Sequence, residues 1–189
     1  MKTALLIVDI QNDYFPGGTM ELAGSDAASL RAKAALDFFR DHRLPVIHIQ
    51  HISTRPGATF FLPDTAGAGI HANVRPLAGE SVFQKNFPNA FRNTPLLDHL
   101  KREQIGSLVI AGMMTSMCID ATVRAAFDHG FQNIVLHDAC ATRALSFDGR
   151  SVPAGQVHAA FLAALGAVYA KVIDVAALPA QIGKAAQNA

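Results

Sequence analysis

Short apolar runs alternate with helical patterns along nearly the whole chain, and this alternation restricts the fold more than any other feature of the sequence. The apolar runs predict strands over residues 4–8, 45–49, 82–84, 108–111, 134–136 and 168–175. Helical patterns lie between them, over residues 26–41, 95–102, 116–129 and 153–165. Strands that alternate with helices in this way form a parallel sheet covered on both faces. We therefore expect an α/β fold built on a mostly parallel sheet.

The helical patterns also predict which side of each helix is buried. In the first helix Leu30, Ala34 and Phe38 fall on one face, because residues four apart lie one turn from each other. Between residues 52 and 79 the chain is rich in Gly and Pro and shows no such pattern, so we expect a long ordered loop. Loops of this length in a compact fold usually cover a site or contact another subunit.

Chain length and composition indicate a single domain. The 189 residues are 50% hydrophobic and 16% charged, which is enough apolar material for one large core. We therefore expect one domain over residues 1–189. The slightly positive mean hydropathy indicates that another subunit covers part of the surface, so we also expect a homo-oligomer.

The charge distribution excludes several classes of partner. The 16 basic and 15 acidic residues are scattered, which leaves no basic face for nucleic acid or a membrane surface. Residues 151–170 carry no Asp, Glu, Lys or Arg, but they include Pro153, Gln156 and His158 and have the spacing of a packed helix. We therefore expect no membrane span, no nucleic-acid partner and a small-molecule substrate.

The two cysteines indicate a reducing compartment. They form no CxxC pair, and the first residues do not resemble an export signal. We expect a cytoplasmic protein with free thiols. Cys140 follows a strand without an acid or base partner in sequence, so we interpret it as structural.

Three reactive residue types follow three of the predicted strands. Asp9, Lys85 and Cys118 come after the first, third and fourth strands, and ligands of such sheets bind at the carboxyl ends of the strands. Each residue has an ordinary structural interpretation: Asp9 could cap a turn, Lys85 could be a surface lysine, and Cys118 could be a buried apolar residue. Cys118 begins a helical pattern, where free N–H groups favour an anion, so we expect its thiol to ionise readily.

Three sequence blocks around these residues resemble the signature blocks of the isochorismatase-like cysteine hydrolases. The blocks are Val8–Asp13, Lys85–Phe91 and Gly112–Cys118, and they occur in the same order, with the likeness covering nearly the whole chain. The resemblance implies a six-stranded Rossmann-like sheet, an Asp9–Lys85–Cys118 triad, and assembly into dimers or larger homo-oligomers.

The residue types of this triad suit acyl transfer. Asp9 would take the proton of Cys118 and later give it to the leaving amine, while Lys85 would hold Asp9 ionised and stabilise the thiolate. Backbone N–H groups of Met114 and Cys118 would form the oxyanion hole. The resemblance also implies a cis peptide bond between Met113 and Met114. Water would finally hydrolyse the Cys118 thioester.

Several functions remain open from the sequence. Family members devoted to vinyl-ether hydrolysis of isochorismate often lack the cysteine, so Cys118 favours cleavage of a small amide or ureido C–N bond. An isochorismate-type hydrolase is the alternative within the family. A thiol redox sensor, with Cys140 as the available second cysteine, and a catalytically silent binding protein are alternatives of other classes. A dinucleotide cofactor is excluded because the first strand is not followed by Gly-x-Gly-x-x-Gly.

We expect neither a metal nor a cofactor. Nicotinamidases of this family build a metal site from an Asp-x-His pair after the second strand, and this chain has His48-Ile49-Gln50-His51 there. His48 and His51 would point to opposite faces of a strand, so we interpret both as core or loop histidines. His71 receives no role.

Residues that flank the triad are the candidates for the substrate pocket. They would form a mostly apolar site with a few polar groups, as small-molecule sites generally are. Ser116 departs from close relatives, which commonly have His there. The candidates are Gln11, Phe15, Phe87, Phe91, Ser116 and Met117.

Overall fold

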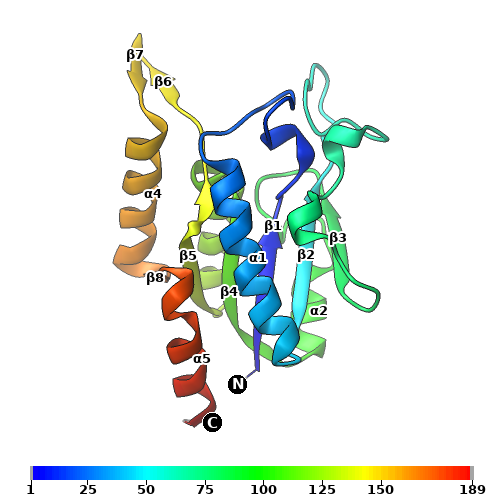
Figure 1. Ribbon diagram of the computed structural model, residues 1–189, viewed down its shortest axis with the longest axis vertical. Coiled ribbons are helices and arrows are strands. Elements are labelled where there is room, and N and C mark those ends of the chain that lie inside the picture. Colours follow the sequence, from blue (N-terminus) through cyan, green and yellow to red (C-terminus); the bar gives the residue numbers. More distant parts are fainter. Residues whose placement is uncertain (1, 188–189) are drawn as a thin grey trace.

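A six-stranded sheet in which every pairing is parallel forms the centre of the molecule (Figure 1). The computed structural model describes residues 2–187, and side chains as far as residue 182. The strand order is β3-β2-β1-β4-β5-β8, so the predicted six-stranded parallel α/β sheet is confirmed. The strands are β1 Lys2–Val8, β2 Val46–His51, β3 Ser81–Lys85, β4 Ile105–Met113, β5 Gln132–Ala141 and β8 Lys171–Ile173.

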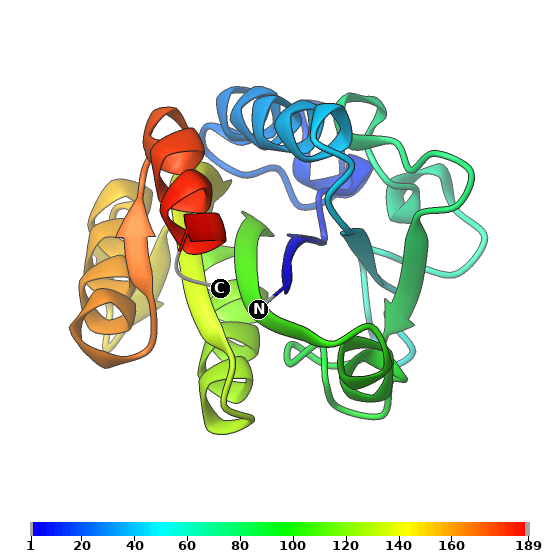
Figure 2. The same cartoon turned by 90° about the horizontal axis from the view of Figure 1, so that it is seen from below.

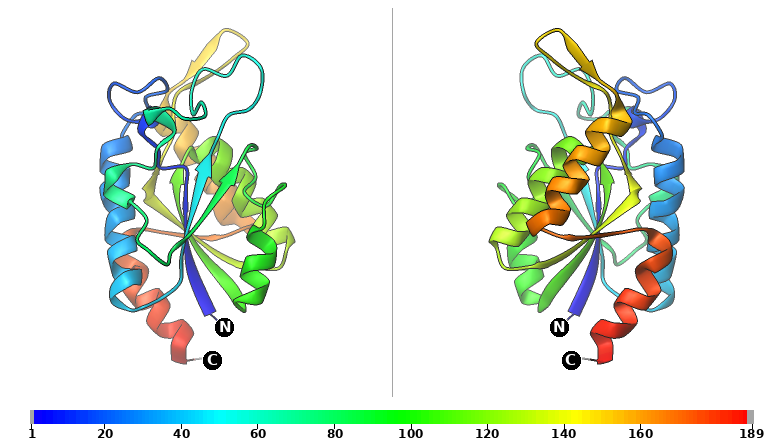
Figure 3. Two further views of the ribbon diagram at one scale, coloured as in Figure 1. Left: turned by 90° about the vertical axis from the view of Figure 1, so that its right-hand side faces the viewer. Right: turned by 90° about the vertical axis from the view of Figure 1, so that its left-hand side faces the viewer.

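Helices cover both faces of the sheet. Helices α1 and α5 lie on one face, and α2, α3 and α4 lie on the other (Figures 2 and 3). Within residues 2–187 no helix is both long and apolar enough to cross a membrane. The helices are α1 Ser25–Asp41, α2 Leu96–Arg102, α3 Asp120–Asp128, α4 Ala154–Val168 and α5 Leu178–Gln187.

The central part of β1, residues 4–8, is an uninterrupted apolar run because both of its faces are buried. Leu5 and Ile7 belong to the apolar cluster beneath α1, whereas Leu6 and Val8 belong to the cluster on the other face. Side chains of a strand alternate between faces, and both faces of this sheet are covered, so consecutive positions in this run are apolar. All four side chains are at most 2% exposed.

The buried face of α1 differs from the prediction. Leu30 is 57% exposed, and the residues that pack on the sheet are Ala28, Ala32, Ala35, Leu36 and Phe39. The small alanines bring the helix close to the sheet, and this face is rotated from the one that the sequence pattern indicated.

Several boundaries also differ from the prediction. The helix expected over residues 116–129 is divided into a π-helical turn, Thr115–Ile119, and α3. Strand β5 runs on to Ala141, because a register shift lets its end pair with the end of β4. Helix α4 extends to Val168, so β8 is shorter than expected. The hairpin formed by β6, Leu145–Phe147, and β7, Arg150–Val152, was not predicted, and it projects beyond α4 (Figure 1).

The long loop after β2 is held against the carboxyl ends of the strands. The Asp13 carboxylate accepts a hydrogen bond from the backbone N–H of Phe61 at 2.6 Å, and Phe61 is completely buried. Gly67 lies directly against the same carboxylate, where a Cβ atom would come within 2.1 Å of it. This covering loop, residues 52–79, is therefore packed against this edge of the sheet. Short 3₁₀ turns interrupt it at Ala66–Ala68 and Ala72–Val74.

Candidate active site

Asp9, Lys85 and Cys118 meet at the carboxyl edge of the sheet. Asp9 follows β1, Lys85 ends β3, and Cys118 lies in the π-helical turn after β4. Lys85 Nζ lies 2.6 Å from Asp9 Oδ2 and donates to Cys118 Sγ at 3.2 Å. The three residues are 0%, 1% and 5% exposed, respectively. An acid, a cation and a thiol thus form one buried cluster, although they are far apart in the sequence.

The backbone between β4 and Cys118 has an unusual path. Gly112 has a φ of 139°, and a Cβ there would lie 1.9 Å from the Val8 carbonyl oxygen, so only glycine lets β4 approach β1 this closely. The peptide bond between Met113 and Met114 is cis. The Met114 carbonyl then accepts hydrogen bonds from the N–H groups of Met117 and Ile119 at 3.0 and 3.2 Å. These bonds close the turn that carries Cys118.

Two hydroxyl groups attach this turn to the end of β5. Thr115 donates from Oγ1 to the Ala141 carbonyl oxygen at 3.3 Å, and Ser116 Oγ lies 2.9 Å from Thr142 Oγ1. All of these side chains are buried. The turn that carries Cys118 is therefore anchored to the end of β5.

Burial governs the protonation of the thiol. Burial raises the pKa of Cys118, and the Asp9 charge raises it further, while Lys85 partly lowers it. The expectation of a readily ionised thiol at a helix start was therefore wrong, since desolvation and the neighbouring carboxylate outweigh the lysine. Burial lowers the pKa of Lys85, but Asp9 and Cys118 more than compensate, so its pKa is raised and the ammonium is retained.

His51 is a fourth member of this cluster. It ends β2, and its Nδ1 lies 2.9 Å from Lys85 Nζ. Burial and the Lys85 charge lower the pKa of His51 to about 4, so the imidazole is neutral near pH 7. The sequence indicated a core or loop histidine here, and the structure places its ring against Lys85 and in the wall of the cavity. The register of β2 beside β3, which pairs His51 directly with Lys85, could not be read from the sequence.

The donor atoms of Asp9, His51 and Cys118 lie within 4.8 Å of one another, which raises the question of a metal. Lys85 Nζ contacts all three of these side chains. A metal ion among them would be placed against a buried ammonium, and the two positive charges would repel each other strongly in this environment. Asp9, His51 and Cys118 therefore surround the Lys85 ammonium as their shared cation, and they do not fit a metal ion.

Gln11 supports His51 and does not line the pocket. Its Nε2 donates to the carbonyl oxygens of His51 and Ala68 at 2.9 and 2.7 Å, and its Oε1 accepts from the N–H of His51 at 2.7 Å. The side chain is completely buried. Gln11 therefore joins the end of β1 to the end of β2 and to the covering loop.

A cavity of about 260 Å³ opens above Cys118. Aromatic and methionine side chains form most of its wall, and polar groups from the covering loop and from the segment after β3 complete it. Of the six pocket residues expected from the sequence, Phe87 and Met117 line it. The lining residues are Tyr14, His51, Ser53, Thr54, Arg55, Phe60, Asn86, Phe87, Pro88, Met114, Met117 and Cys118.

The other expected pocket residues lie elsewhere for identifiable reasons. Phe15 stacks on His71 with ring centroids 3.6 Å apart, and it belongs to the core beneath the covering loop. Phe91 packs on Phe131 within the core of the opposite face. Ser116 turns toward Thr142, and Gln11 holds the backbone of β2. Sequence proximity to the triad did not reveal these directions.

Tyr14 and Phe60 are the main pocket residues that sequence reasoning missed. Tyr14 is 1% exposed and stacks edge-on against Phe61, and burial together with the Cys118 and Asp9 charges raises its pKa well above its usual value. Its phenol is therefore neutral beside the thiol. The one sequence feature that pointed to Phe60 was its place in the long Gly- and Pro-rich loop, which was expected to cover a site.

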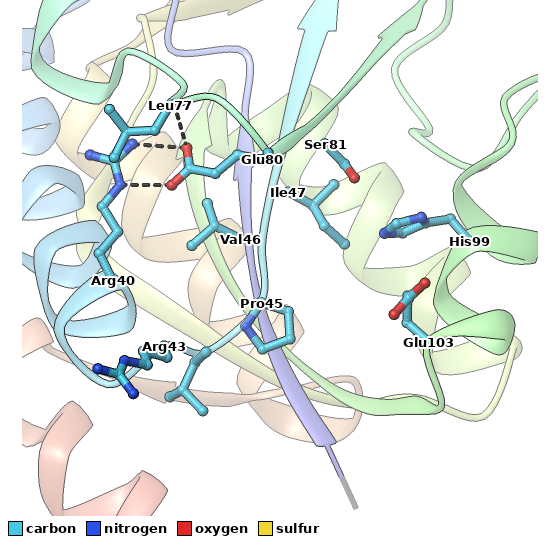
Figure 4. A pocket seen from close by; sticks show the side chains of 12 residues that line it. Arg40, Arg43, Pro45, Val46, Ile47, Leu77, Glu80, Ser81, His99 and Glu103 are labelled. Atoms are coloured by element: carbon cyan, nitrogen blue, oxygen red, sulfur yellow. Dashed lines mark hydrogen bonds and ion pairs between the residues drawn. The ribbon is translucent and has the colours of Figure 1, made fainter.

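A larger groove of about 610 Å³ lies at the opposite end of the sheet, at the beginnings of β2 and β3 (Figure 4). Arg40 donates two hydrogen bonds to the Glu80 carboxylate at 2.7 and 2.8 Å, and Glu80 also contacts His48 Nε2 at 2.9 Å. The fully buried His48 is thus a core histidine, as the sequence indicated. The Glu80 carboxylate is held by Arg40 and His48, whereas the cavity above Cys118 adjoins the acid, the cation and the thiol, so that smaller cavity is the candidate active site.

Comparisons with known proteins show which family the chain belongs to. The family model of the isochorismatase domain matches residues 3–177. YddQ of Bacillus subtilis, an uncharacterized isochorismatase family protein, is 51% identical over 91% of this chain and 96% of its own length. A crystal structure assigned as an isochorismatase hydrolase, from Oleispira antarctica, is 48% identical with a TM-score of 0.91, covering 95% of this chain and 96% of that one. Maleamate amidohydrolase of Pseudomonas putida is 30% identical over 75% of this chain and 73% of its own length. The chain is therefore a member of the isochorismatase family of hydrolases.

Proposed function

We propose that the protein is a cysteine hydrolase that cleaves a small amide or ureido C–N bond. The observation that carries this proposal is the buried contact of Lys85 with both Asp9 and Cys118 at the base of a cavity. A nucleophile, a base and a fixed positive charge within contact distance are the groups that acyl transfer through a thioester requires.

The reaction begins with a neutral thiol. As Cys118 Sγ attacks the carbonyl carbon, its proton passes to the Asp9 carboxylate, so no free thiolate has to exist in the buried site. The carbonyl oxygen becomes an oxyanion, and the backbone N–H groups of Met114 and Cys118 are the proposed donors to it. Asp9 then returns the proton to the leaving nitrogen as the C–N bond breaks. The products of this half-reaction are an amine or ammonia and a Cys118 thioester.

Water completes the cycle. Asp9 takes a proton from the water as the water oxygen attacks the thioester carbonyl. Asp9 then gives this proton to Cys118 Sγ as the C–S bond breaks, which releases the acid and restores both the thiol and the Asp9 carboxylate. Lys85 keeps one positive charge beside Asp9 and Cys118 throughout, which offsets whichever of them is negative at each step.

The cavity favours a small substrate with an apolar part. Its volume of about 260 Å³ lies below the roughly 300–1,000 Å³ typical of pockets for drug-sized ligands. Phe60, Phe87 and Met117 supply apolar wall, and Asn86 and Arg55 supply polar groups at the side. The relation to maleamate amidohydrolase supports an amide of a small acid as the substrate class.

The raised pKa of Cys118 disfavours the redox-sensor alternative. Sensor cysteines react as exposed thiolates, whereas Cys118 is 5% exposed and its thiol is neutral. Burial also raises the pKa of Cys140 to about 12. A buried, neutral thiol beside a carboxylate suits a hydrolase in which Asp9 takes the thiol proton during the attack on substrate.

A substrate panel tests the proposal. Purified protein is incubated with small amides, ureido acids and isochorismate, and release of ammonia or of the other product is measured. Cys118→Ala should abolish turnover of the amides with the fold retained, and Cys140→Ala, a matched removal of the other cysteine, should retain it. A quenched reaction should show an acyl adduct on Cys118 by intact mass. Full amide turnover by Cys118→Ala, or turnover of isochorismate alone, would refute the thioester mechanism.

We also propose that the chain forms one domain and assembles as a homo-oligomer. Helix α4 carries no charged residue, and its Val168 is 62% exposed, which supports a covering subunit. Light scattering coupled to size-exclusion chromatography measures the mass directly, and a monomer at all concentrations would contradict the assembly.

A further inference from the structure

The hydrogen bonds of Lys85 determine which nitrogen of His51 carries a proton. An ammonium group has three N–H donors and no acceptor. Its three close partners are Asp9 Oδ2 at 2.6 Å, His51 Nδ1 at 2.9 Å and Cys118 Sγ at 3.2 Å. His51 Nδ1 must therefore accept, which requires it to be unprotonated. A neutral imidazole with a bare Nδ1 carries its hydrogen on Nε2.

The ionisation state of His51 agrees with this geometry. Burial and the Lys85 charge lower its pKa to about 4, while Asp9 opposes and Arg55 adds to the lowering. The ring is therefore neutral across the range in which most enzymes work. Its Nε2–H remains a donor throughout that range.

The position of His51 is fixed by several independent contacts. Gln11 hydrogen-bonds both the N–H and the carbonyl oxygen of His51, and the ring lies 5.9 Å from that of Phe61. The same ring lines the cavity beside Met114 and Cys118. A side chain held in this way can present one nitrogen to Lys85 and the other to a bound molecule.

We propose that His51 is a two-sided positioning residue: its Nδ1 orients the Lys85 ammonium, and its Nε2–H donates a hydrogen bond to an oxygen of the bound substrate. This inference rests on the proposed hydrolase function. It assigns the site to amides that carry a hydrogen-bond acceptor within reach of the scissile carbonyl group. Amides whose remainder is purely hydrocarbon would cover this donor, on a half-buried side chain, without offering it an acceptor, and they should bind less well.

Two substitutions separate the two sides of the ring. His51→Asn keeps an acceptor oxygen near the position of Nδ1 and loses the donor at Nε2. His51→Gln reaches the position of Nε2 and loses the acceptor for Lys85. We expect His51→Asn to raise KM about tenfold with kcat little changed, the effect of losing one hydrogen bond. We expect His51→Gln to lower kcat, because Lys85 loses one of its three acceptors. His42→Asn, at an exposed histidine after α1, should change neither constant.

Two further measurements need no substrate. In nitrogen-15 NMR of the histidine rings in the whole protein, the signal that His51→Asn removes should belong to a ring that stays neutral with its proton on Nε2 from pH 8 to pH 5. The rate at which iodoacetamide alkylates Cys118, followed against pH, should be unchanged in His51→Asn and several-fold lower at pH 8 in His51→Gln, because a displaced Lys85 no longer supports the thiolate.

The outcomes distinguish the two proposals. If no amide is hydrolysed but the NMR and alkylation results are as expected, the proposed function fails and the orientation of Lys85 by His51 stands. If amides are hydrolysed and His51 carries its proton on Nδ1, or titrates near pH 6.5, the inference about His51 is overturned. Equal KM and kcat changes in His51→Asn and His51→Gln would overturn it as well.

Discussion

Replacement of Lys85 by methionine removes one buried ammonium group and keeps a side chain of similar length. The change leaves the Asp9 carboxylate buried without its ion-pair partner, and it removes donors from His51 Nδ1 and Cys118 Sγ. Two opposite charges 2.6 Å apart attract by about 6 kcal/mol at an effective dielectric constant of about 20. Desolvation opposes part of this attraction, and loss of one partner of a buried pair typically costs about 3–5 kcal/mol.

We therefore expect Lys85→Met to lower the free energy of unfolding by about 3–5 kcal/mol, measured by urea denaturation at pH 7. The double variant Asp9→Asn/Lys85→Met contains no buried charge at this place, so it should be more stable than Lys85→Met alone. Lys33→Met is the matched control, because Lys33 forms an ion pair with Asp37 in which both side chains are nearly half exposed. That variant should lose less than about 0.5 kcal/mol.

A loss below about 1 kcal/mol in Lys85→Met would refute this reasoning, since it would mean that Asp9 is not held as a buried anion by Lys85. A double variant that is less stable than Lys85→Met would also refute it. Such results would remove the electrostatic basis of the proposed mechanism as well, because Lys85 is assigned the role of keeping Asp9 available as a base.

Three other predictions follow from local contacts. Gly112→Ala should lower the free energy of unfolding by more than about 2 kcal/mol in urea, because its Cβ would overlap the Val8 carbonyl oxygen. Burial raises the pKa of Glu80, but hydrogen bonds from Arg40, the Leu77 N–H group and His48 outweigh it and set the pKa at about 2. Stability from Glu80 is thus present above its unfolded pKa of about 4.5 and is lost as pH falls from there toward 2, so Glu80→Gln should flatten the thermal stability profile in that range. Phe87→Ala should raise KM for a small amide substrate roughly 10- to 200-fold by removing pocket wall.

The Gly112 and Phe87 predictions each have a control in the same chain. Gly155 lies in α4 with open space where a Cβ would be, so Gly155→Ala should stabilise the protein by about 0.5–1 kcal/mol. Phe147 is 83% exposed at the β6–β7 hairpin, and Phe147→Ala should leave KM unchanged. An unchanged stability of Gly112→Ala, a steep acid loss that persists in Glu80→Gln, or a KM that is the same in Phe87→Ala and wild type would each contradict its prediction.

The strand and helix pattern predicted the sheet well because burial on both faces requires uninterrupted apolar runs, and these are visible in the sequence. The same pattern misplaced the buried face of α1. It favoured the face of Leu30, Ala34 and Phe38, whereas the helix packs through the adjacent face of Ala32, Leu36 and Phe39. Both faces combine large apolar residues with alanine, so which of them is buried depends on how the helix docks on the neighbouring elements.

The pocket residues, too, were predicted only in part from the sequence. Phe87 and Met117 were identified because they adjoin Lys85 and Cys118, but adjacency in sequence does not determine side-chain direction, and Phe91 and Ser116 turn away. Tyr14 reaches the cavity from the 3₁₀ turn after β1, Asn12–Tyr14, and Phe60 reaches it from the covering loop. The expected thiolate character of Cys118 was wrong because solvent exclusion, which depends on the whole fold, outweighs the lysine.

By itself the sequence determined the order of strands and helices and which reactive residues would stand at strand ends, because both depend on local periodicity and on the position of each residue along its strand. Only the tertiary structure decided that β2 and β3 pair with His51 beside Lys85, that the thiol is desolvated, and which side chains surround the cavity. Strand register, burial and side-chain direction are consequences of packing between segments distant in sequence, and no local pattern carries that information.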